Sequence, residues 1–491
     1  MGVIQKQALR TTVISFLGIG IGMISQISLP FILDDKEQIG VLQLLNSVSR
    51  IFATIFCFGF TQIAMLTFAN FRNEKKGHSG FLIFAIIFSL GGIALGELVF
   101  FLTRDFFIGV GDEYKLVRSL SYLIFPIIFF RIIYSNLDIY FRLLYKSVTG
   151  AFLEQVLLKF FILMSLMLFF LGWIDYEHMA IVYAFALSLP GIVILVLAFK
   201  SEDKIVWPKK ELFTAEAKRK MMGYGLFGVI SSASGVIIVS IDSVMINKMM
   251  STADVGVYSV LFFAGTLVSV PSRGIKRISI TVLSEAWKSK NEKEITDVYQ
   301  KSVINQTVIG VYFFILGWLC IAPALTFLPK YQDGLYVFFF IGLGQLFDMM
   351  TGVNAEIIGT SEKFRVNTYF NITLALLVIG FNFFFIQEWG IVGAAAASGL
   401  AILLVNLARW YYLKKVFGFQ PFVPKVAFVA LLGVVIVVLG VLVPLPFTPV
   451  LQMITYTILV TILFWAVVLK FNLAPDLSAW ILKMKHKFIG K

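Results

Sequence analysis

The chain has 491 residues, of which 59% are hydrophobic and only 14% are charged. Water-soluble domains carry roughly a quarter of their residues as charged side chains, so this composition excludes a soluble enzyme or a soluble binding domain. The formal net charge is +13, and we attribute it to orientation in a membrane and contact with anionic lipids rather than to nucleic-acid binding.

Apolar segments follow one another along nearly the whole chain, and each can cross a bilayer as a helix, which takes about 20 residues. The sequence therefore predicts an all-α membrane protein with about fourteen transmembrane helices. In chain order we expect these spans at 8–33, 39–70, 80–102, 117–141, 150–172, 178–199, 221–247, 255–286, 300–328, 334–357, 366–386, 391–413, 425–443 and 449–470.

The basic residues between these spans alternate from one side to the other. With the N-terminus placed in the cytoplasm and basic residues towards the inner ends of spans counted as inside, 32 of the 41 Lys and Arg residues fall inside and six fall in outside loops; the last three, Arg50, Arg131 and Lys159, lie deep within spans. This bias follows the positive-inside rule and predicts that both termini are cytoplasmic. The six outside residues are Lys36, Arg104, Lys115, Arg118, Lys248 and Lys330.

The two halves of the chain resemble each other. The second span opens with Ile-Gly-Val at Ile39, and the eighth opens with Val-Gly-Val at Val255, 216 residues later. We expect a six-helix lobe at 1–199, a cytoplasmic linker at 200–220, a second pseudo-symmetric six-helix lobe at 221–424, two additional helices at 425–470 and a basic amphipathic cytoplasmic tail at 471–491. Lobes in parallel orientation place a substrate site between them.

Polar residues at helical spacing mark one face of the second and eighth spans. Asn46 and Arg50 belong to the stripe in the second span, and Arg50 lies roughly 16 Å into the membrane at 1.5 Å per residue. The eighth span carries Thr266, Arg273, Lys276 and Arg277, with a kink expected at Pro271. We interpret these faces as a water-filled, substrate-binding cavity; the alternative is that the basic side chains extend to the membrane interface.

Four further charged residues lie within spans, where charge is costly and usually functional. Arg131 and Lys159 are candidates for substrate binding, and Glu154 and Asp348 are candidates for binding a coupling ion. The alternative is structural: an ion pair such as Arg131 with Asp138, or carboxyls that are neutralised within the packing.

The sequence offers no catalytic motif. Gly223, Gly225 and Gly228 spell the dinucleotide-binding pattern G-x-G-x-x-G, but no strand precedes them, so we interpret them as helix-packing positions. The chain contains no Walker A sequence and no cluster of metal-ligating His and Cys residues. We therefore expect neither enzymatic activity nor a cofactor.

Residues 240–260 resemble the polysaccharide-transporter family, the Wzx-type flippases. The resemblance rests on Asp242, Met245 and Ile246 at a helix end, followed by Gly256 and Tyr258 at the start of the next span. In the first half, Gly40 is kept but Leu42 stands in place of the tyrosine. The fourteen-span plan is shared with the lipid II flippases and multidrug antiporters of the same superfamily.

The resemblance implies a flippase in the bacterial inner membrane. Its substrate would be an undecaprenyl-pyrophosphate-linked oligosaccharide, such as a repeat unit of O-antigen in lipopolysaccharide or of a capsule, moved by alternating access. Implied partners are this lipid-linked oligosaccharide, membrane lipids and polysaccharide polymerase or assembly proteins. A cation-coupled multidrug antiporter is the main alternative, and a membrane scaffold for glycan-assembly enzymes is a third.

Overall fold

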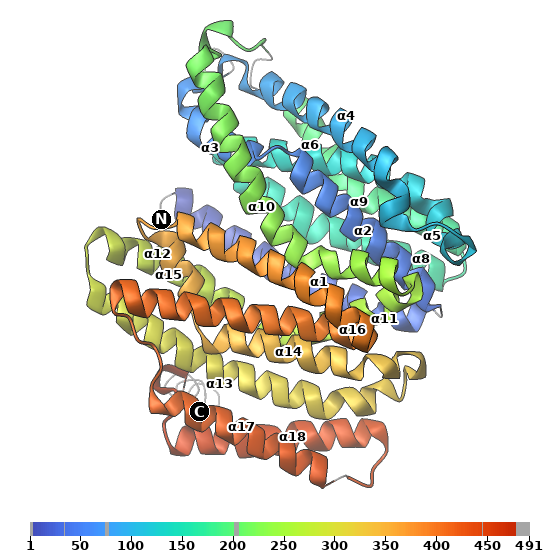
Figure 1. The fold of residues 1–491 in the computed structure, drawn as a ribbon, viewed down its shortest axis with the longest axis vertical. Coiled ribbons are helices and arrows are strands. Elements are labelled where there is room, and N and C mark those ends of the chain that lie inside the picture. The colour runs from blue at the N-terminus through green and yellow to red at the C-terminus, as the bar shows by residue number, and fades with distance from the viewer. Residues whose placement is uncertain (1–2, 34, 74–77, 201–205, 444, 478–491) are drawn as a thin grey trace, which may run out of the picture. The chain divides into compact units, whose positions relative to one another are not determined.

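The computed structural model describes residues 3–33, 35–73, 78–200, 206–443 and 445–477. Every regular element in these ranges is a helix (Figure 1). The chain forms two compact units, Met1–Ser259 and Val260–Lys491. The predicted tail at 471–491 falls largely on residues 478–491, which lie outside the described ranges.

The first unit contains the first seven spans. Its helices are α1 (Val3–Ile32), α2 (Lys36–Phe56), α3 (Phe60–Phe71), α4 (Phe81–Ile108), α5 (Lys115–Leu120), α6 (Ile124–Leu143), α7 (Ser147–Phe152), α8 (Leu158–Phe170), α9 (Tyr176–Phe199) and α10 (Ala215–Met249). A π-helical turn, Leu153–Leu157, joins α7 to α8.

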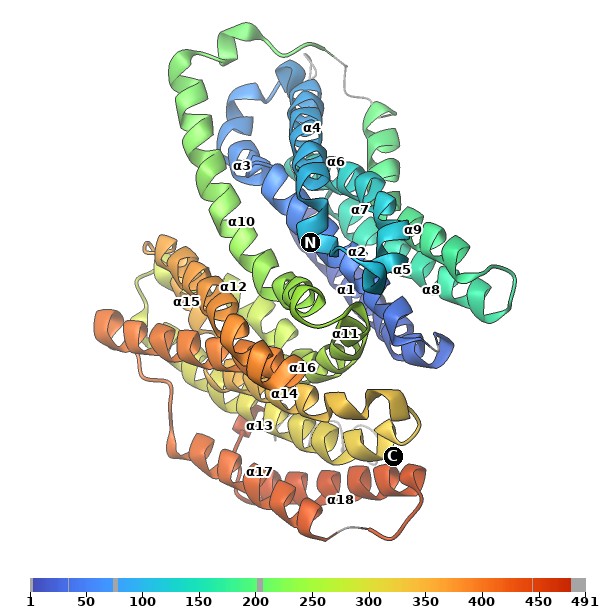
Figure 2. The ribbon, with the colours of Figure 1, turned by 45° about the vertical axis from the view of Figure 1, so that its right-hand side comes forward.

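The division between the units falls within α11 (Thr252–Thr266). The second unit continues with α12 (Ser272–Lys288), α13 (Glu292–Leu325), α14 (Leu335–Met350), α15 (Asn354–Thr360), α16 (Arg365–Phe417), α17 (Pro424–Leu442) and α18 (Pro449–Lys470). The last two helices, at the predicted additional spans, pack on α13 and on each other (Figure 2).

Thirteen helices among the described residues are long and apolar enough to cross a membrane. One of them, α16, has 53 residues and contains Gly390 with φ 55° and ψ −135°, a conformation outside the helical region. Gly390 therefore separates two spans, which correspond to the predicted segments 366–386 and 391–413. The resulting fourteen spans confirm the fold class expected from the sequence.

The second and eighth spans are both interrupted. Between α2 and α3, Gly59 adopts a left-handed conformation with φ 64°. Between α11 and α12 lie a short 3-10 turn, Leu267–Ser269, and Pro271, which cannot donate a backbone hydrogen bond and disfavours a continuous helix. The kink expected at Pro271 is therefore confirmed, and the second span is interrupted at Gly59.

Two repeat-equivalent glycines, Gly40 and Gly256, meet where α2 and α11 begin. A Cβ atom at Gly40 would lie 1.8 Å from the carbonyl oxygen of Thr252, and one at Gly256 would lie 2.0 Å from that of Lys36. Both the glycines and the carbonyls are 216 residues apart in the sequence. The aliphatic-Gly-Val triplets thus mark a pseudo-symmetric contact between helix backbones, which only glycine permits.

The linker predicted at 200–220 overlaps the start of α10, which begins at Ala215, whereas the compact units divide after α10. The reason is that α10 packs on α2, α3 and α4 of the first unit. The predicted lobe boundaries describe the sequence repeat, and their role as moving bodies stays a prediction.

Replacing Gly390 by Ala tests the break in α16. Because a side chain strongly disfavours this backbone conformation, we expect Gly390→Ala to lower the free energy of unfolding by about 1–3 kcal/mol. Gly380→Ala is the matched control, since no atom lies within 4 Å of its Cβ position and alanine favours a helix. Equal unfolding curves for the two variants in detergent would contradict the assignment of a break.

Candidate functional site

The first unit brings two predicted site residues together, Arg131 on α6 and Asn46 on α2. Arg131 donates through Nη1 to the Asn46 carbonyl at 3.0 Å and through Nη2 to the Asn46 side-chain oxygen at 2.6 Å. These two hydrogen bonds fix the plane of the guanidinium group. Asn46 therefore holds Arg131 in position, a role that its spacing in the sequence did not reveal.

Arg50 lies one helical turn beyond Asn46 on α2, and its side chain is exposed. It makes no hydrogen bond or ion pair with any residue that the structure describes. The positive charges of Arg50 and Arg131 are close enough to interact, and the charge of Glu154 acts on Arg131 more weakly. Two arginines near one carboxylate leave excess positive charge inside the membrane-spanning region, which favours an anionic ligand.

Glu154 lies in the π-helical turn between α7 and α8 and is exposed. The hydroxyl of Tyr134 on α6 lies 3.0 Å from the Gly150 carbonyl and 3.4 Å from Glu154 Oε2. Single π-turns inside helices occur often at functional sites because they redirect side chains. Glu154 is thus directed towards the face of α6 that carries Tyr134.

The structural alternative for Arg131, an ion pair with Asp138, is wrong. Asp138 forms its ion pair with Arg142, one turn further along α6. Arg131 instead uses its donors on Asn46. The reason is that a separation of seven residues spans two turns, whereas a separation of four brings the charged groups together.

Lys159 joins the fifth span to the first. Its ammonium group lies 3.1 Å from the Gly18 carbonyl on α1 and 3.1 Å from Gln155 Oε1 on its own helix segment. A Cβ atom at Gly22 would lie 3.2 Å from the Lys159 side chain. Lys159 therefore packs against glycines of α1, a contact that stabilises the pairing of these helices.

The second unit brings together Lys276 and Asp348, which the sequence presented as separate candidates. Lys276 Nζ on α12 lies 2.5 Å from Asp348 Oδ2 on α14, and both side chains are about a quarter exposed. Asn406 on α16 donates to the other carboxylate oxygen at 3.3 Å and accepts a hydrogen bond from Asn354 at 3.0 Å. The positive charge of Lys276 is thus largely compensated by Asp348.

Glu356 on α15 and Arg409 on α16 complete this charge cluster. Both interact electrostatically with Lys276, and Arg409 also donates to the Asn371 side chain at 2.6 Å. The cluster contains two cationic and two anionic side chains. Its charges therefore compensate one another, unlike those of the arginines in the first unit.

The remaining predicted residues lie on or next to α12. Arg273 and Arg277 are exposed, and neither side chain bonds to any part of the chain that the structure describes. Thr266 donates to the carbonyl of Phe263 in its own helix at 2.7 Å. The two arginines are thus available to a ligand, while the Thr266 hydroxyl is occupied by its helix.

Sequence reasoning missed Asn354, Glu356, Asn406 and Arg409. Arg409 and Glu356 fall near the ends of the predicted spans 391–413 and 334–357, where polar residues attract no notice, although the Arg409 side chain is only 6% exposed. Polar residues near span ends are common, so only their convergence in space distinguishes these four. One signal of a charge within the membrane was available in the sequence: Arg409 lies four residues before the predicted end of its span at 413.

Comparison by sequence finds distant relatives. No protein-family model matches the chain. It is 21% identical over 191 residues to the capsular polysaccharide biosynthesis protein CapF of Staphylococcus aureus, covering 38% of this chain and 48% of that protein. It is 20% identical over 264 residues to the uncharacterized membrane protein MJ1068 of Methanocaldococcus jannaschii, covering 52% of each. The chain thus matches about half the length of these curated relatives.

Comparison by structure covers nearly the whole chain. The inward closed conformation of the lipid II flippase MurJ superposes with a TM-score of 0.70 and 13% identity, covering 94% of this chain and 98% of that one. An inward-facing multidrug resistance MATE transporter of the MOP superfamily gives 0.63 and 14% identity, covering 85% and 95%. The protein is therefore a multi-pass membrane protein with the fold that MurJ and MATE share.

A double-mutant cycle tests the ion pair between Lys276 and Asp348. We expect Lys276→Ala and Asp348→Ala each to destabilise the protein and the double variant to recover part of the loss, with a coupling energy of about 1–3 kcal/mol. The control is the exposed pair Lys220 and Glu216, at 2.7 Å, for which coupling should stay below about 0.5 kcal/mol. Unfolding in mixed micelles measures both, and equal coupling in the two pairs would refute the assignment.

Proposed function

We propose that the protein is a flippase for an undecaprenyl-pyrophosphate-linked oligosaccharide, a repeat unit of O-antigen or of a capsule. It works by alternating access in the bacterial inner membrane, with both termini in the cytoplasm. The observation that carries this proposal is the pair of arginines in the first unit, Arg50 and Arg131, whose combined charge exceeds that of the nearby Glu154. Lipid-linked sugars bring a matching anion, the pyrophosphate, to this depth of the membrane.

The geometry of the two arginines suits a pyrophosphate group. Asn46 holds Arg131 in a fixed orientation, which lowers the entropic cost of ordering that side chain around a ligand. Arg50 is exposed on the adjacent turn. Guanidinium groups donate paired hydrogen bonds to phosphate oxygens, and these bonds strengthen where water is scarce.

The related proteins support a lipid-linked cargo. MurJ, which has the same fold, is described as a flippase of lipid II, and CapF is described as a protein of capsular polysaccharide biosynthesis. The first description names a lipid cargo, and the second names a polysaccharide product. The resemblance of residues 240–260 to the polysaccharide transporters supports the same cargo.

A multidrug antiporter is the second candidate, since MATE transporters have this fold. The charge of the site disfavours cationic drugs as cargo. A cation near Arg50 and Arg131 would be repelled by two positive charges and attracted by one, Glu154. Efflux of cationic dyes from vesicles containing the intact protein would favour the antiporter over the flippase.

Of the two candidate residues for a coupling ion, Glu154 is the better placed. Its contact in the structure is the Tyr134 hydroxyl at 3.4 Å, whereas Asp348 is already paired with Lys276. Glu154 also acts electrostatically on Arg131, so a change in its charge alters the anion site directly. Undecaprenyl-pyrophosphate transport with and without an imposed proton or sodium gradient measures this coupling.

Removing both cations of the first-unit site tests the proposed cargo. We expect the double variant Arg50→Ala, Arg131→Ala to fold but to flip a fluorescent undecaprenyl-pyrophosphate-linked sugar at least about tenfold more slowly, because each lost contact to phosphate costs about 1.5–3 kcal/mol. The assay measures loss of the probe from the inner leaflet of proteoliposomes.

Lys415→Ala is the matched control, since it removes one exposed cation near the end of α16. Its flipping rate should equal that of the parent protein. If the arginine double variant also flips at the parent rate while remaining monodisperse, the anion site assigned to these residues is wrong.

A single-atom change at Asn46 separates positioning from charge. In Asn46→Asp the carboxylate pairs with Arg131 and cancels one positive charge, so we expect flipping to fall by about tenfold or more. Asn46→Ala removes the side-chain acceptor of Arg131 without adding charge, and we expect a smaller loss. Rates of probe movement in proteoliposomes compare the two variants, and an Asn46→Asp rate at or above that of Asn46→Ala would contradict the proposal.

A further inference from the structure

The charge cluster of the second unit contains polar atoms that the fold leaves without partners. The Nε of Arg409, the Oε2 of Glu356 and the Oδ1 of Asn367 are each enclosed by the protein and form no hydrogen bond with the described residues. An enclosed polar atom without a partner destabilises a protein, so natural structures contain few of them. Three such atoms around one cluster need a common explanation.

Contacts between α15 and α16 place the three atoms in one region of the second unit. Arg409 donates through Nη2 to the Asn371 side chain at 2.6 Å, and Asn371 lies one helical turn beyond Asn367 on α16. A Cβ atom at Gly359 of α15 would lie 3.7 Å from the Asn367 side-chain nitrogen. Glu356 lies one turn before Gly359, and the charge of Arg409 acts on it.

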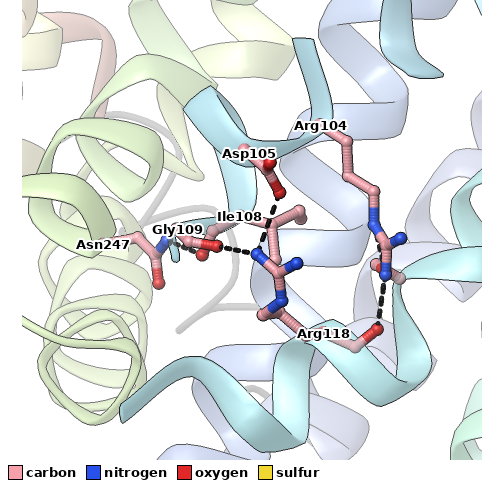
Figure 3. Close-up of polar contacts among 7 residues, drawn as sticks. Arg104, Asp105, Ile108, Gly109, Arg118 and Asn247 are labelled. Carbon is pink, nitrogen blue, oxygen red and sulfur yellow. Dashed lines mark hydrogen bonds and ion pairs between the residues drawn. The ribbon is translucent and has the colours of Figure 1, made fainter. Parts of the chain in front are cut away.

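Buried polar side chains that serve only the fold of this protein are bonded differently. Asn247 on α10 is fully buried, and its amide donates to the Ile108 carbonyl at 3.0 Å (Figure 3). Its side-chain oxygen accepts from the Thr252 hydroxyl at 2.8 Å. Arg118 donates to the neighbouring Gly109 carbonyl at 2.7 Å (Figure 3). Both ends of the Asn247 side chain are therefore satisfied, unlike the three atoms of the second unit.

The unsatisfied atoms select the chemistry of a ligand. The carboxylate of Glu356 can only accept hydrogen bonds, and the Nε of Arg409 can only donate them. A pyrophosphate supplies acceptors alone and an ammonium group supplies donors alone, so neither satisfies both atoms. A hydroxyl group donates and accepts. The cluster therefore suits a ligand that carries several hydroxyl groups.

The composition of the cluster also favours an uncharged ligand. The positive charges of Lys276 and Arg409 are offset by Asp348 and Glu356. Amide side chains, each with a donor and an acceptor, surround these charges: Asn354, Asn367, Asn371 and Asn406. The side chains of Lys276 and Asp348 are about a quarter exposed, so a ligand can reach the cluster at this edge.

We propose that this cluster binds the sugar of the cargo, whereas the arginines of the first unit bind its pyrophosphate. The proposal rests on the proposed function, which supplies a cargo with a sugar. Glu356, Asn367 and Arg409 lie near the ends of their predicted spans, on the side that the charge rule assigns to the cytoplasm. The proposed cycle takes its cargo from that side. Sugar hydroxyl groups complete the hydrogen bonds that these three residues lack.

Removing the amide of Asn367 tests this proposal with two lipids. Asn367→Leu keeps the branched shape of the side chain, and because no bond of the fold is lost, we expect melting within about 2 °C of the parent. The fluorescent undecaprenyl-pyrophosphate-linked sugar should flip at least about fivefold more slowly, because its hydroxyl loses a partner. Undecaprenyl pyrophosphate carrying the same label but no sugar should flip within about twofold of the parent rate. Asn367→Ala serves if leucine impairs folding.

Asn305→Leu is the matched control. Its side-chain oxygen is also enclosed without a partner, but it lies on α13, which contributes no residue to the cluster, so both lipids should move at the parent rate. The double variant Arg50→Ala, Arg131→Ala should slow both lipids, since both carry the pyrophosphate. If Asn367→Leu slows the two lipids equally, or slows neither, the sugar site is wrong.

A parent protein that moves neither lipid would contradict the proposed function, and the sugar site is then decided by binding alone. Saturation-transfer NMR on the solubilised protein uses the free oligosaccharide that mild acid releases from the probe. We expect transfer to the sugar protons from the parent and from Asn305→Leu, and at least about threefold less from Asn367→Leu. Equal transfer from all three proteins, or none from any, would overturn the proposal.

Discussion

The cost of placing charge in an apolar medium is the constraint on which the rest of this structure depends. One cluster of the second unit meets it by compensation: Lys276, Asp348, Glu356 and Arg409 balance one another, while Arg273 and Arg277 stay exposed. The first unit meets it only in part, because Arg131 feels the charges of both Arg50 and Glu154, and Arg50 has no ion-pair partner among the described residues. This difference in balance is what makes the first unit the candidate for an anionic cargo.

A second constraint is helix association. In a membrane, helices must come into contact without the hydrophobic effect that drives association in water, and glycine makes this possible. Inside a membrane, association depends on close packing, and backbones approach most closely where no side chain intervenes. Gly40 and Gly256 meet each other across the repeat, and Gly59 meets Gly225. These contacts give α10 and the start of α11 their place in the first unit.

The candidate site shows which contacts the spacing of residues in the sequence can predict and which it cannot. The stripe on the second span correctly placed Asn46 and Arg50 on one helix, but only the structure shows that Asn46 holds Arg131, a residue 85 positions away. Spacing likewise suggested that Arg131 pairs with Asp138, whereas Arg142 is the partner. Distances along one helix are set by its pitch, while contacts between helices depend on packing that no single segment encodes.

By itself the sequence determined the all-helical membrane fold, the fourteen spans and the kink at Pro271. Backbone groups in lipid have no water to bond, so apolar segments of this length must form helices, and their composition alone identifies them. Only the tertiary structure decided which charges compensate one another and that α10 packs on α2, α3 and α4. Those outcomes depend on which helices become neighbours, and the neighbours are chosen by shape and charge from segments far apart in the chain.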